Sequence, residues 1–159
     1  RRFRVELAQH LSPIDIARFS TGRVLASALP FSTIHEGRWI DRQLGPERAR
    51  TSFPFRTLLD AGAVVTFGSG WLDRGSPIDG IYAAVTRRTL DGLHPQGWVP
   101  HQRLTVEEAL ASPHVLVGST GQCVETLLAW RERWGLSYIG LSEDIMVEFA
   151  PVVDALAGV

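Results

Sequence analysis

The chain has 159 residues, of which 45% are hydrophobic and 21% are charged, and this is the composition of one globular domain able to bury a core. Its formal charge of -1 and isoelectric point near 6.6 give no electrostatic reason to expect a nucleic acid or an anionic membrane as partner. All 16 basic residues are arginines, which excludes chemistry that needs a lysine, such as a Schiff base.

The cysteine count and the hydropathy pattern exclude further classes of protein. A single cysteine, Cys123, excludes an internal disulfide and a cysteine-only metal site within one chain. No apolar run approaches the roughly 20 residues of a membrane span, and no signal-peptide pattern opens the chain. We therefore expect a cytoplasmic protein that binds neither membrane nor nucleic acid.

The first half of the sequence predicts strands that alternate with helices. Ser12 and Pro13 indicate a helix start, and Pro30 ends a strand candidate. Between that proline and Pro54 the sequence has no clear period, as in a long connection from a strand to a helix. The predicted elements are, in order, a strand at 3–8, a helix from 13, a strand at 23–29, a helix at 55–61 and a buried parallel strand at 63–67.

The second half continues the alternation, which favours a parallel sheet. Thr105 and Glu108 have the spacing of a capping box, and Gly135 ends a long helix. That helix carries an apolar stripe made of Val124, Leu127, Leu128 and Trp134. The predicted elements are a helix at 77–88, a loop at 92–100, a short helix from 105, a strand at 114–117, a helix at 120–134, a strand at 136–141 and a helix at 148–156.

Four strings in the first 111 residues carry a family resemblance. They are RFRVELA at 2–8, PFSTIHEGRW at 30–39, FGSGW at 67–71, and IYAAVTRR at 81–88 with LTVEEAL at 104–110. In order and spacing they resemble the closing part of a metal-dependent amidohydrolase of the family-3 type, which acts on non-peptide carbon–nitrogen bonds. The resemblance implies a (β/α)8 barrel, which usually needs about 250 residues. We therefore expect only part of a barrel.

The resemblance also implies where metal ligands should lie, and other residues stand there. The family's sixth strand ends in a Glu-His pair, which here is Glu6-Leu7, and Gly70 replaces the aspartate after the eighth strand. Ser32 stands at the histidine of the family's Pro-x-His motif, and the earlier ligands would precede Arg1. A hydrolytic metal, zinc in this family, needs several nitrogen or oxygen ligands. We therefore expect no bound metal and an inactive remnant.

The remaining polar and aromatic groups give weaker candidates. His35 and Glu36 are adjacent in the loop that would lie over the barrel mouth, where they are candidates for acid–base chemistry. The five histidines are scattered and have no ligand spacing, which favours packing roles for most of them. Arg87 and Arg88 are interpreted as a charge pair favoured by a helix C-terminus. Three loop tryptophans are expected to pack rather than to line a pocket: Trp39, Trp71 and Trp98.

The last 48 residues carry a different resemblance. Their strings are SPHVLVG at 112–118, ETLLAWRERWG at 125–135, LSYIGL at 136–141 and EFAPVVDALAG at 148–158. They resemble the tail of a luciferase-like, flavin- or deazaflavin-dependent monooxygenase. The resemblance implies a loop at 117–120 near a flavin phosphate, and Ser119, Thr120 and Gly121 at a helix start could bind an anion through free amides.

Together these observations predict a single α/β domain over residues 1–159, a partial or hybrid (β/α) TIM-barrel-like fold with a parallel sheet. An amidohydrolase-like body at 1–111 joins a luciferase-like tail at 112–159. The function hypothesis is an inactive remnant or hybrid of an amidohydrolase. The alternatives are a metal hydrolase with a relocated site, a flavin- or deazaflavin-dependent oxidoreductase fragment, and a designed or recombinant scaffold. No cofactor is expected, and the small-molecule ligand is unknown. An incomplete sheet exposes strand edges, so we expect a homo-oligomer.

Overall fold

The computed structural model describes residues 3–69, 76–112, 116, 118–135 and 145–158. It contains two compact units, residues 1–115 and residues 116–159, and each is described by itself. That both belong to a single domain stays a prediction. Within the described ranges, no helix has the length and apolar character needed to cross a membrane.

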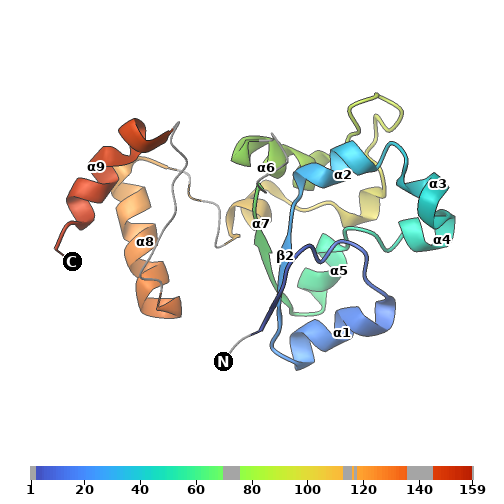
Figure 1. The fold of residues 1–159 in the computed structure, drawn as a ribbon, viewed down its shortest axis with the longest axis horizontal. Coiled ribbons are helices and arrows are strands. Elements are labelled where there is room, and N and C mark those ends of the chain that lie inside the picture. Colours follow the sequence, from blue (N-terminus) through green and yellow to red (C-terminus); the bar gives the residue numbers. More distant parts are fainter. Residues whose placement is uncertain (1–2, 70–75, 113–115, 117, 136–144, 159) are drawn as a thin grey trace. The chain divides into compact units, whose positions relative to one another are not determined.

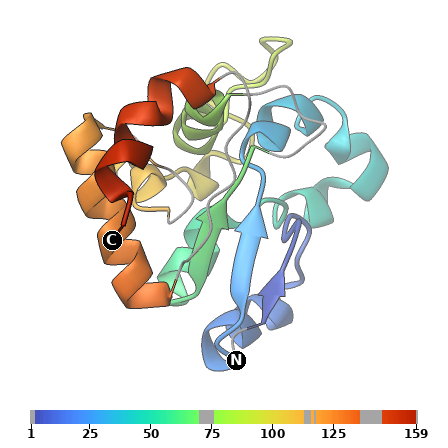
Figure 2. The ribbon, with the colours of Figure 1, turned by 60° about the vertical axis from the view of Figure 1, so that its left-hand side comes forward.

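The first unit contains a parallel three-stranded sheet in the order β1-β2-β3 (Figures 1 and 2). The strands are β1 (Arg4–Val5), β2 (Leu25–Ala28) and β3 (Val64–Phe67). β2 lies between the other two, since Leu25 is in register with Arg4 on one side and with Val64 on the other. One face of the sheet presents small and β-branched or aromatic side chains that are buried: Ala26, Ala28, Val65 and Phe67. The predicted α/β class and parallel sheet are confirmed.

β1 is shorter than the strand predicted at 3–8. Leu7 has a φ of 54°, which turns the backbone out of the extended conformation just after the strand. The amide of Ala8 nevertheless donates to the carbonyl of Ser27 at 2.9 Å, so the chain stays beside β2 for a few residues more.

Two helices cover the core side of this sheet. α1 (Pro13–Thr21) begins as predicted, because the Ser12 side chain accepts a hydrogen bond from the Asp15 amide and Pro13 occupies the first turn. It buries Ile16 and Phe19. α5 (Phe55–Asp60) buries Phe55 and Leu58, and the Phe55 ring packs edge-to-face on Phe67 of β3 with centroids 5.1 Å apart. Apolar burial by these helices therefore anchors the sheet.

The connection at 31–54 contains three short helices where the sequence showed no period. They are α2 (Phe31–Glu36), α3 (Ile40–Leu44) and α4 (Pro46–Ala49). Each spans less than two turns, which is too short to repeat an apolar face. Tertiary packing holds them, since they bury Ile34, Ile40 and Ala49.

After β3 the first unit continues with α6 (Pro77–Thr86), the 3₁₀ turn η1 (Pro100–Gln102) and α7 (Val106–Leu110). α6 and α7 both open with capping boxes, Ser76 with Asp79 and Thr105 with Glu108, and the second of these confirms a prediction. α6 ends before the predicted residue 88, because Arg87 takes a φ of 53° and points into the core.

The second unit consists of α8 (Thr120–Trp134) and α9 (Met146–Leu156). The bounds of α8 confirm the prediction, including Gly135 at its end with a φ of 67°. The predicted stripe is partly wrong, since Leu128 is 37% exposed while Cys123 and Leu127 are buried against Val152 of α9. The strands predicted at 114–117 and 136–141 lie outside the described residues, with the exception of Leu116. The Trp134 side chain is also outside the described part of the chain.

Candidate functional site

The carboxyl ends of parallel strands meet at one edge of a sheet, where α/β proteins usually place their ligands. In the first unit this carboxyl edge is formed by the segments that follow β1, β2 and β3, beginning at Glu6, Leu29 and Gly68. The family positions Leu7 and Ser32 and the histidine His10 lie on these segments.

A cavity of about 150 Å³ opens at the carboxyl edge between the ends of β2 and β3 and the start of α6. Its described lining is apolar apart from two serine hydroxyls, and none of these residues has an ionisable side chain. The Ser76 hydroxyl is engaged in the capping box of α6. The cavity therefore offers room for a small apolar group. It is lined by Pro30, Phe67, Gly68, Ser69, Ser76, Pro77, Gly80 and Ile81.

The positions at which the family resemblance implies metal ligands have no shared geometry here. Leu7 is 58% exposed and has no ligating atom, and Ser32 is buried within α2. Gly70 lies outside the described residues. In the part of the chain that the structure describes, no three histidine, cysteine, aspartate or glutamate side chains come together in a way that could hold a metal ion.

Instead, the carboxyl edge brings together three polar groups that are distant in the sequence. His10, in the connection after β1, lies with Nδ1 3.0 Å from Ser52 Oγ and with Nε2 3.7 Å from Glu36 Oε2. The His10 ring packs edge-to-face on Phe53, with centroids 5.3 Å apart. Partial burial of the imidazole lowers the pKa of His10. The predicted pair His35-Glu36 is thus divided, since Glu36 faces His10 while His35 is exposed.

Sequence reasoning missed this cluster because its members come from different connections. His10 and Ser52 are 42 residues apart, and a backbone bridge between the two residues holds their segments together. No local spacing signals such a pair. The one available signal is topological: both segments follow strands that end at the same edge.

Beneath this cluster a buried arginine fixes the backbone that carries Ser52. The guanidinium of Arg87 donates to three carbonyl oxygens, those of Trp98 at 2.9 Å, Phe53 at 3.1 Å and Ser52 at 3.5 Å. Its charged carbon lies 5.5 Å from the ring centroid of Phe55 and 5.3 Å from that of Trp98, both within cation–π range.

The interpretation of Arg87 as part of a charge pair at a helix end is therefore wrong. Arg87 is fully buried, whereas Arg88 is exposed and donates to the Pro95 carbonyl. Burial, with a smaller contribution from Arg103, lowers the pKa of Arg87 to about 9. Carbonyl oxygens and aromatic faces take the place of water around this cation.

The backbone is strained at Arg87 and at two residues near it. Phe53, Arg87 and Val99 all have φ near 50°, a region that bulky residues rarely occupy. The Phe53 amide donates to Gln9, and the Trp98 amide donates to the Arg87 carbonyl. Several hydrogen bonds, from Arg87 and from its neighbours, therefore hold the backbone around Phe53 and Arg87 in this strained conformation.

The tryptophans that were expected to pack can be checked in two cases. Trp98 is 3% exposed and belongs to the core, and its indole nitrogen lies 3.2 Å from both carboxylate oxygens of Asp41. Trp39 is partly buried against the same core. The rings of both tryptophans therefore pack against the core, as predicted. Trp71 lies outside the described residues.

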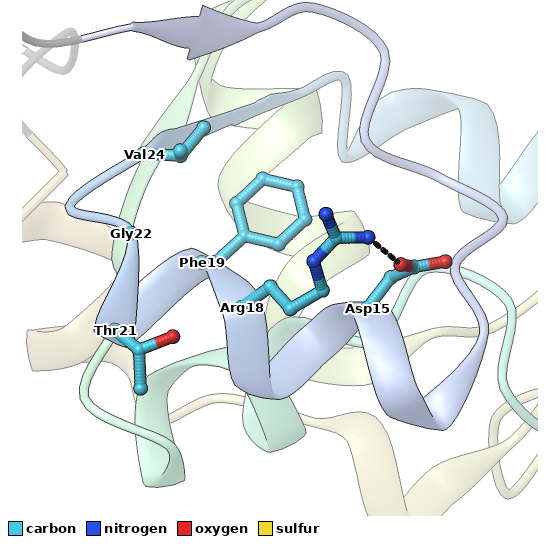
Figure 3. Close-up of a pocket in the computed structure, with 6 residues that line it drawn as sticks. All are labelled: Asp15, Arg18, Phe19, Thr21, Gly22 and Val24. Carbon is cyan, nitrogen blue, oxygen red and sulfur yellow. Dashed lines mark hydrogen bonds and ion pairs between the residues drawn. The ribbon is translucent and has the colours of Figure 1, made fainter.

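A second cavity, of about 380 Å³, lies at the opposite edge of the sheet, between the end of α1 and the start of β2 (Figure 3). Figure 3 shows the Phe19 ring between Val24 and the ion pair of Arg18 with Asp15, whose atoms are 3.0 Å apart. Hydrogen bonds from Ser12 and Arg18 lower the pKa of Asp15. The ion pair is exposed and internal to one helix, which indicates a surface depression rather than a built site.

In the second unit, the residues suggested for flavin phosphate lie at the start of α8. The Ser119 amide donates to Gln122 Oε1 at 2.9 Å, and the Gln122 amide donates to Ser119 Oγ at 3.4 Å. A capping box thus satisfies two of the amides at this helix start. Ser119, Thr120 and Gly121 are all exposed.

Two solved structures with a similar fold are each described as an uncharacterised metal-dependent hydrolase. The one from Pyrococcus furiosus matches with a TM-score of 0.57 at 25% identity, and the one from Pyrococcus horikoshii OT3 with 0.59 at 23% identity. Each match covers 79% of this chain but 24% of the hydrolase. The parallel sheet and its connections therefore define part of a hydrolase-type (β/α) barrel, as the sequence predicted.

The family follows from a second comparison. A model of the amidohydrolase family matches residues 1–112, and this chain belongs to that family. The protein LONG AFTER FAR-RED 3 of Arabidopsis thaliana is 35% identical over 112 residues, which are 69% of this chain and 19% of that protein. The chain thus spans about a fifth of this curated relative. The resemblance of residues 112–159 to luciferase-like monooxygenases stays a prediction.

Proposed function

We propose that the first unit supplies the closing βα units of an amidohydrolase barrel and acts as a scaffold without supplying metal ligands. The observation that carries this proposal is Leu7. It stands at the carboxyl end of β1, where the family resemblance implies a ligating histidine, and its exposed side chain has no donor atom for a metal. Hydrolysis of carbon–nitrogen bonds by this segment alone is therefore not expected.

Metal analysis of the purified full chain tests the scaffold role. We expect far less than one zinc ion per chain after purification without chelator, and no gain of metal in Leu7→His, because one added imidazole does not complete a site. Elemental analysis that finds about one tightly bound metal ion per chain in the unmodified protein would refute the proposal and favour a hydrolase with a relocated site.

A second candidate concerns the last 48 residues. The family match ends at residue 112 and the first compact unit at residue 115, close to the boundary between residues 111 and 112 that the sequence predicts. This agreement favours a separate origin of the second unit, and we propose a luciferase-like tail that can bind a flavin phosphate at the start of α8. Saturable binding of flavin mononucleotide but not of riboflavin supports this role. Absence of binding by both removes it.

We further propose that the chain associates through the open edge of β1. β1 pairs with β2 alone among the described strands, and Phe3, Val5 and Leu7 expose apolar side chains beside it. Unpaired strand edges with apolar flanks promote association. Light scattering is expected to find dimers or larger species. A monomer at high concentration contradicts this.

A further inference from the structure

The connections that leave β1 and β2 at the carboxyl edge place an imidazole and a carboxylate face to face. His10 lies in the first connection, and Glu36 is the last residue of α2 in the second. Their side chains are 38% and 22% exposed, so both are partly shielded yet still reached by solvent. The cavity beside α6 and the lost metal positions do not include either residue.

The hydrogen bonds around Ser52 determine which nitrogen of His10 carries the proton. The Ser52 hydroxyl donates its single hydrogen to the Arg48 carbonyl at 3.1 Å, a common bond from a serine to the carbonyl four residues earlier. Its oxygen can then only accept at its other contact, 3.0 Å from His10 Nδ1. The neutral imidazole therefore holds its hydrogen on Nδ1, and Nε2 has a free lone pair.

The distance from Nε2 to Glu36 agrees with this tautomer. At 3.7 Å the two atoms are beyond hydrogen-bond length, whereas an Nε2–H group would be drawn to the carboxylate as a charge-assisted donor. Two acceptors that face each other at this spacing accommodate a group that donates to both.

We propose that His10 and Glu36 form a proton-accepting site for an O–H or N–H group of water or of a small polar molecule, with Ser52 as the residue that sets the tautomer. The proton moves from the bound donor to Nε2, the donor becomes its conjugate base, and the imidazolium forms an ion pair with Glu36. Throughout this transfer, Nδ1 keeps its own hydrogen and continues to donate it to the Ser52 hydroxyl oxygen. This inference goes beyond the scaffold role and does not rest on it.

The surroundings make the site rigid, which general acid–base chemistry requires. Ser52 is fully buried, and its own carbonyl accepts from Arg87. The neighbouring Phe53 ring supports the His10 ring on one side. The lowered pKa of His10 keeps the imidazole neutral, and hence ready to accept a proton, near neutral pH.

Nitrogen NMR of the full chain labelled at histidine tests the tautomer. His10→Gln identifies the His10 signals, which are expected to show Nδ1 protonated and Nε2 unprotonated. In Ser52→Ala the signals should move toward the Nε2–H form that free imidazoles prefer. The matched control is Thr51→Ala, because Thr51 also donates to the Arg48 carbonyl without contacting His10, and it should leave the tautomer unchanged. An Nε2–H tautomer in the unmodified protein overturns the proposal.

A chemical probe tests whether Nε2 is accessible and basic without relying on the Ser52 variant to fold. Diethyl pyrocarbonate modifies unprotonated imidazole nitrogens, and peptide mapping should find His10 modified at a rate at least comparable to the exposed His35. Glu36→Gln is expected to lower the pH at which His10 becomes half reactive, because it removes the carboxylate that stabilises the imidazolium. Failure of His10 to react, or an unchanged midpoint in Glu36→Gln, overturns the proposal.

Discussion

Replacement of Arg87 by alanine should be among the most destabilising single changes in the first unit. The side chain is fully buried, and its donors satisfy the carbonyls of Trp98, Phe53 and Ser52. Alanine removes these donors, although the Phe53 carbonyl keeps the hydrogen bond from the Phe55 amide at 2.9 Å, and it opens space between the rings of Phe55 and Trp98.

The magnitude follows from these contacts. A buried acceptor left unsatisfied costs about 1–3 kcal/mol, and this applies in full to the Trp98 carbonyl, whose bond to Arg87 is 2.9 Å long. The Phe53 carbonyl still accepts from the Phe55 amide, so loss of its bond to Arg87 costs only about 0.5–1.5 kcal/mol. Loss of the cation–π contacts adds roughly 0.5–2 kcal/mol, whereas removal of a buried charge returns part of its desolvation penalty. The net loss is expected at about 2–4 kcal/mol, a large share of the usual 5–15 kcal/mol. Arg87→Lys keeps the charge but not the planar fork, so an intermediate loss of about 1–3 kcal/mol is expected.

Urea denaturation followed by far-ultraviolet circular dichroism measures these free energies. The matched control is Arg88→Ala, which removes the same charge from the adjacent, exposed residue and should change stability by less than about 0.5 kcal/mol. Equal losses in Arg87→Ala and Arg88→Ala would refute the argument that buried carbonyls depend on this guanidinium.

Three further changes test the packing, the titration and the capping described above. Leu127→Ala should destabilise α8 against α9 by about 2–5 kcal/mol, whereas Leu128→Ala, at a 37% exposed position, should cost well under about 1 kcal/mol; thermal melts of both variants decide. Because burial lowers the folded-state pKa of His10, the unfolded state binds more protons than the folded state below about pH 6.5. The free energy of unfolding should therefore fall as the pH falls through that region. If His10→Gln shows the same slope of unfolding free energy against pH, the prediction is contradicted. Thr105→Ala removes the acceptor of the Glu108 amide and should cost about 1 kcal/mol, while Thr105→Ser keeps the hydroxyl and should leave the melting temperature nearly unchanged.

The elements that the sequence predicted well are those whose signal is local. The helix start at Ser12 and the capping box at Thr105 depend on side chains within three residues of the backbone they cap. The β-branched run of β3 lies in a buried parallel strand as expected. The three helices of residues 31–54 could not be predicted in this way, since tertiary contacts hold them rather than their own periodicity. α3 and α4 contribute Ile40 and Ala49 to the core, and α2 packs against α6.

The candidate site was less predictable than the fold because its geometry is non-local. Glu36 was singled out for its neighbour in the sequence, but the structure places it against His10 from another connection. Arg87 looked like an ordinary helix-end cation, and its burial depends on carbonyls that lie 11 to 35 residues away. The absence of a ligating group at Leu7, by contrast, follows from residue chemistry once the family resemblance implies a histidine at that position.

The register of the sheet has a consequence for the order in which this chain folds. Pairing β2 with β1 closes a loop of about 20 residues, and pairing β2 with β3 closes a loop of about 40 residues. Because each doubling of loop length adds only about 0.6 kcal/mol of entropic cost, the longer loop is only slightly less favourable to close. β3 forms the longer ladder and is joined to α5 by a tight turn, because the Ala63 amide donates to the Leu58 carbonyl. The later-made strand is therefore expected to nucleate the sheet. During synthesis the edge of β2 that binds β3 stays unpaired until β3 emerges, so the newly made chain is most exposed to misassociation over the interval between residues 28 and 64.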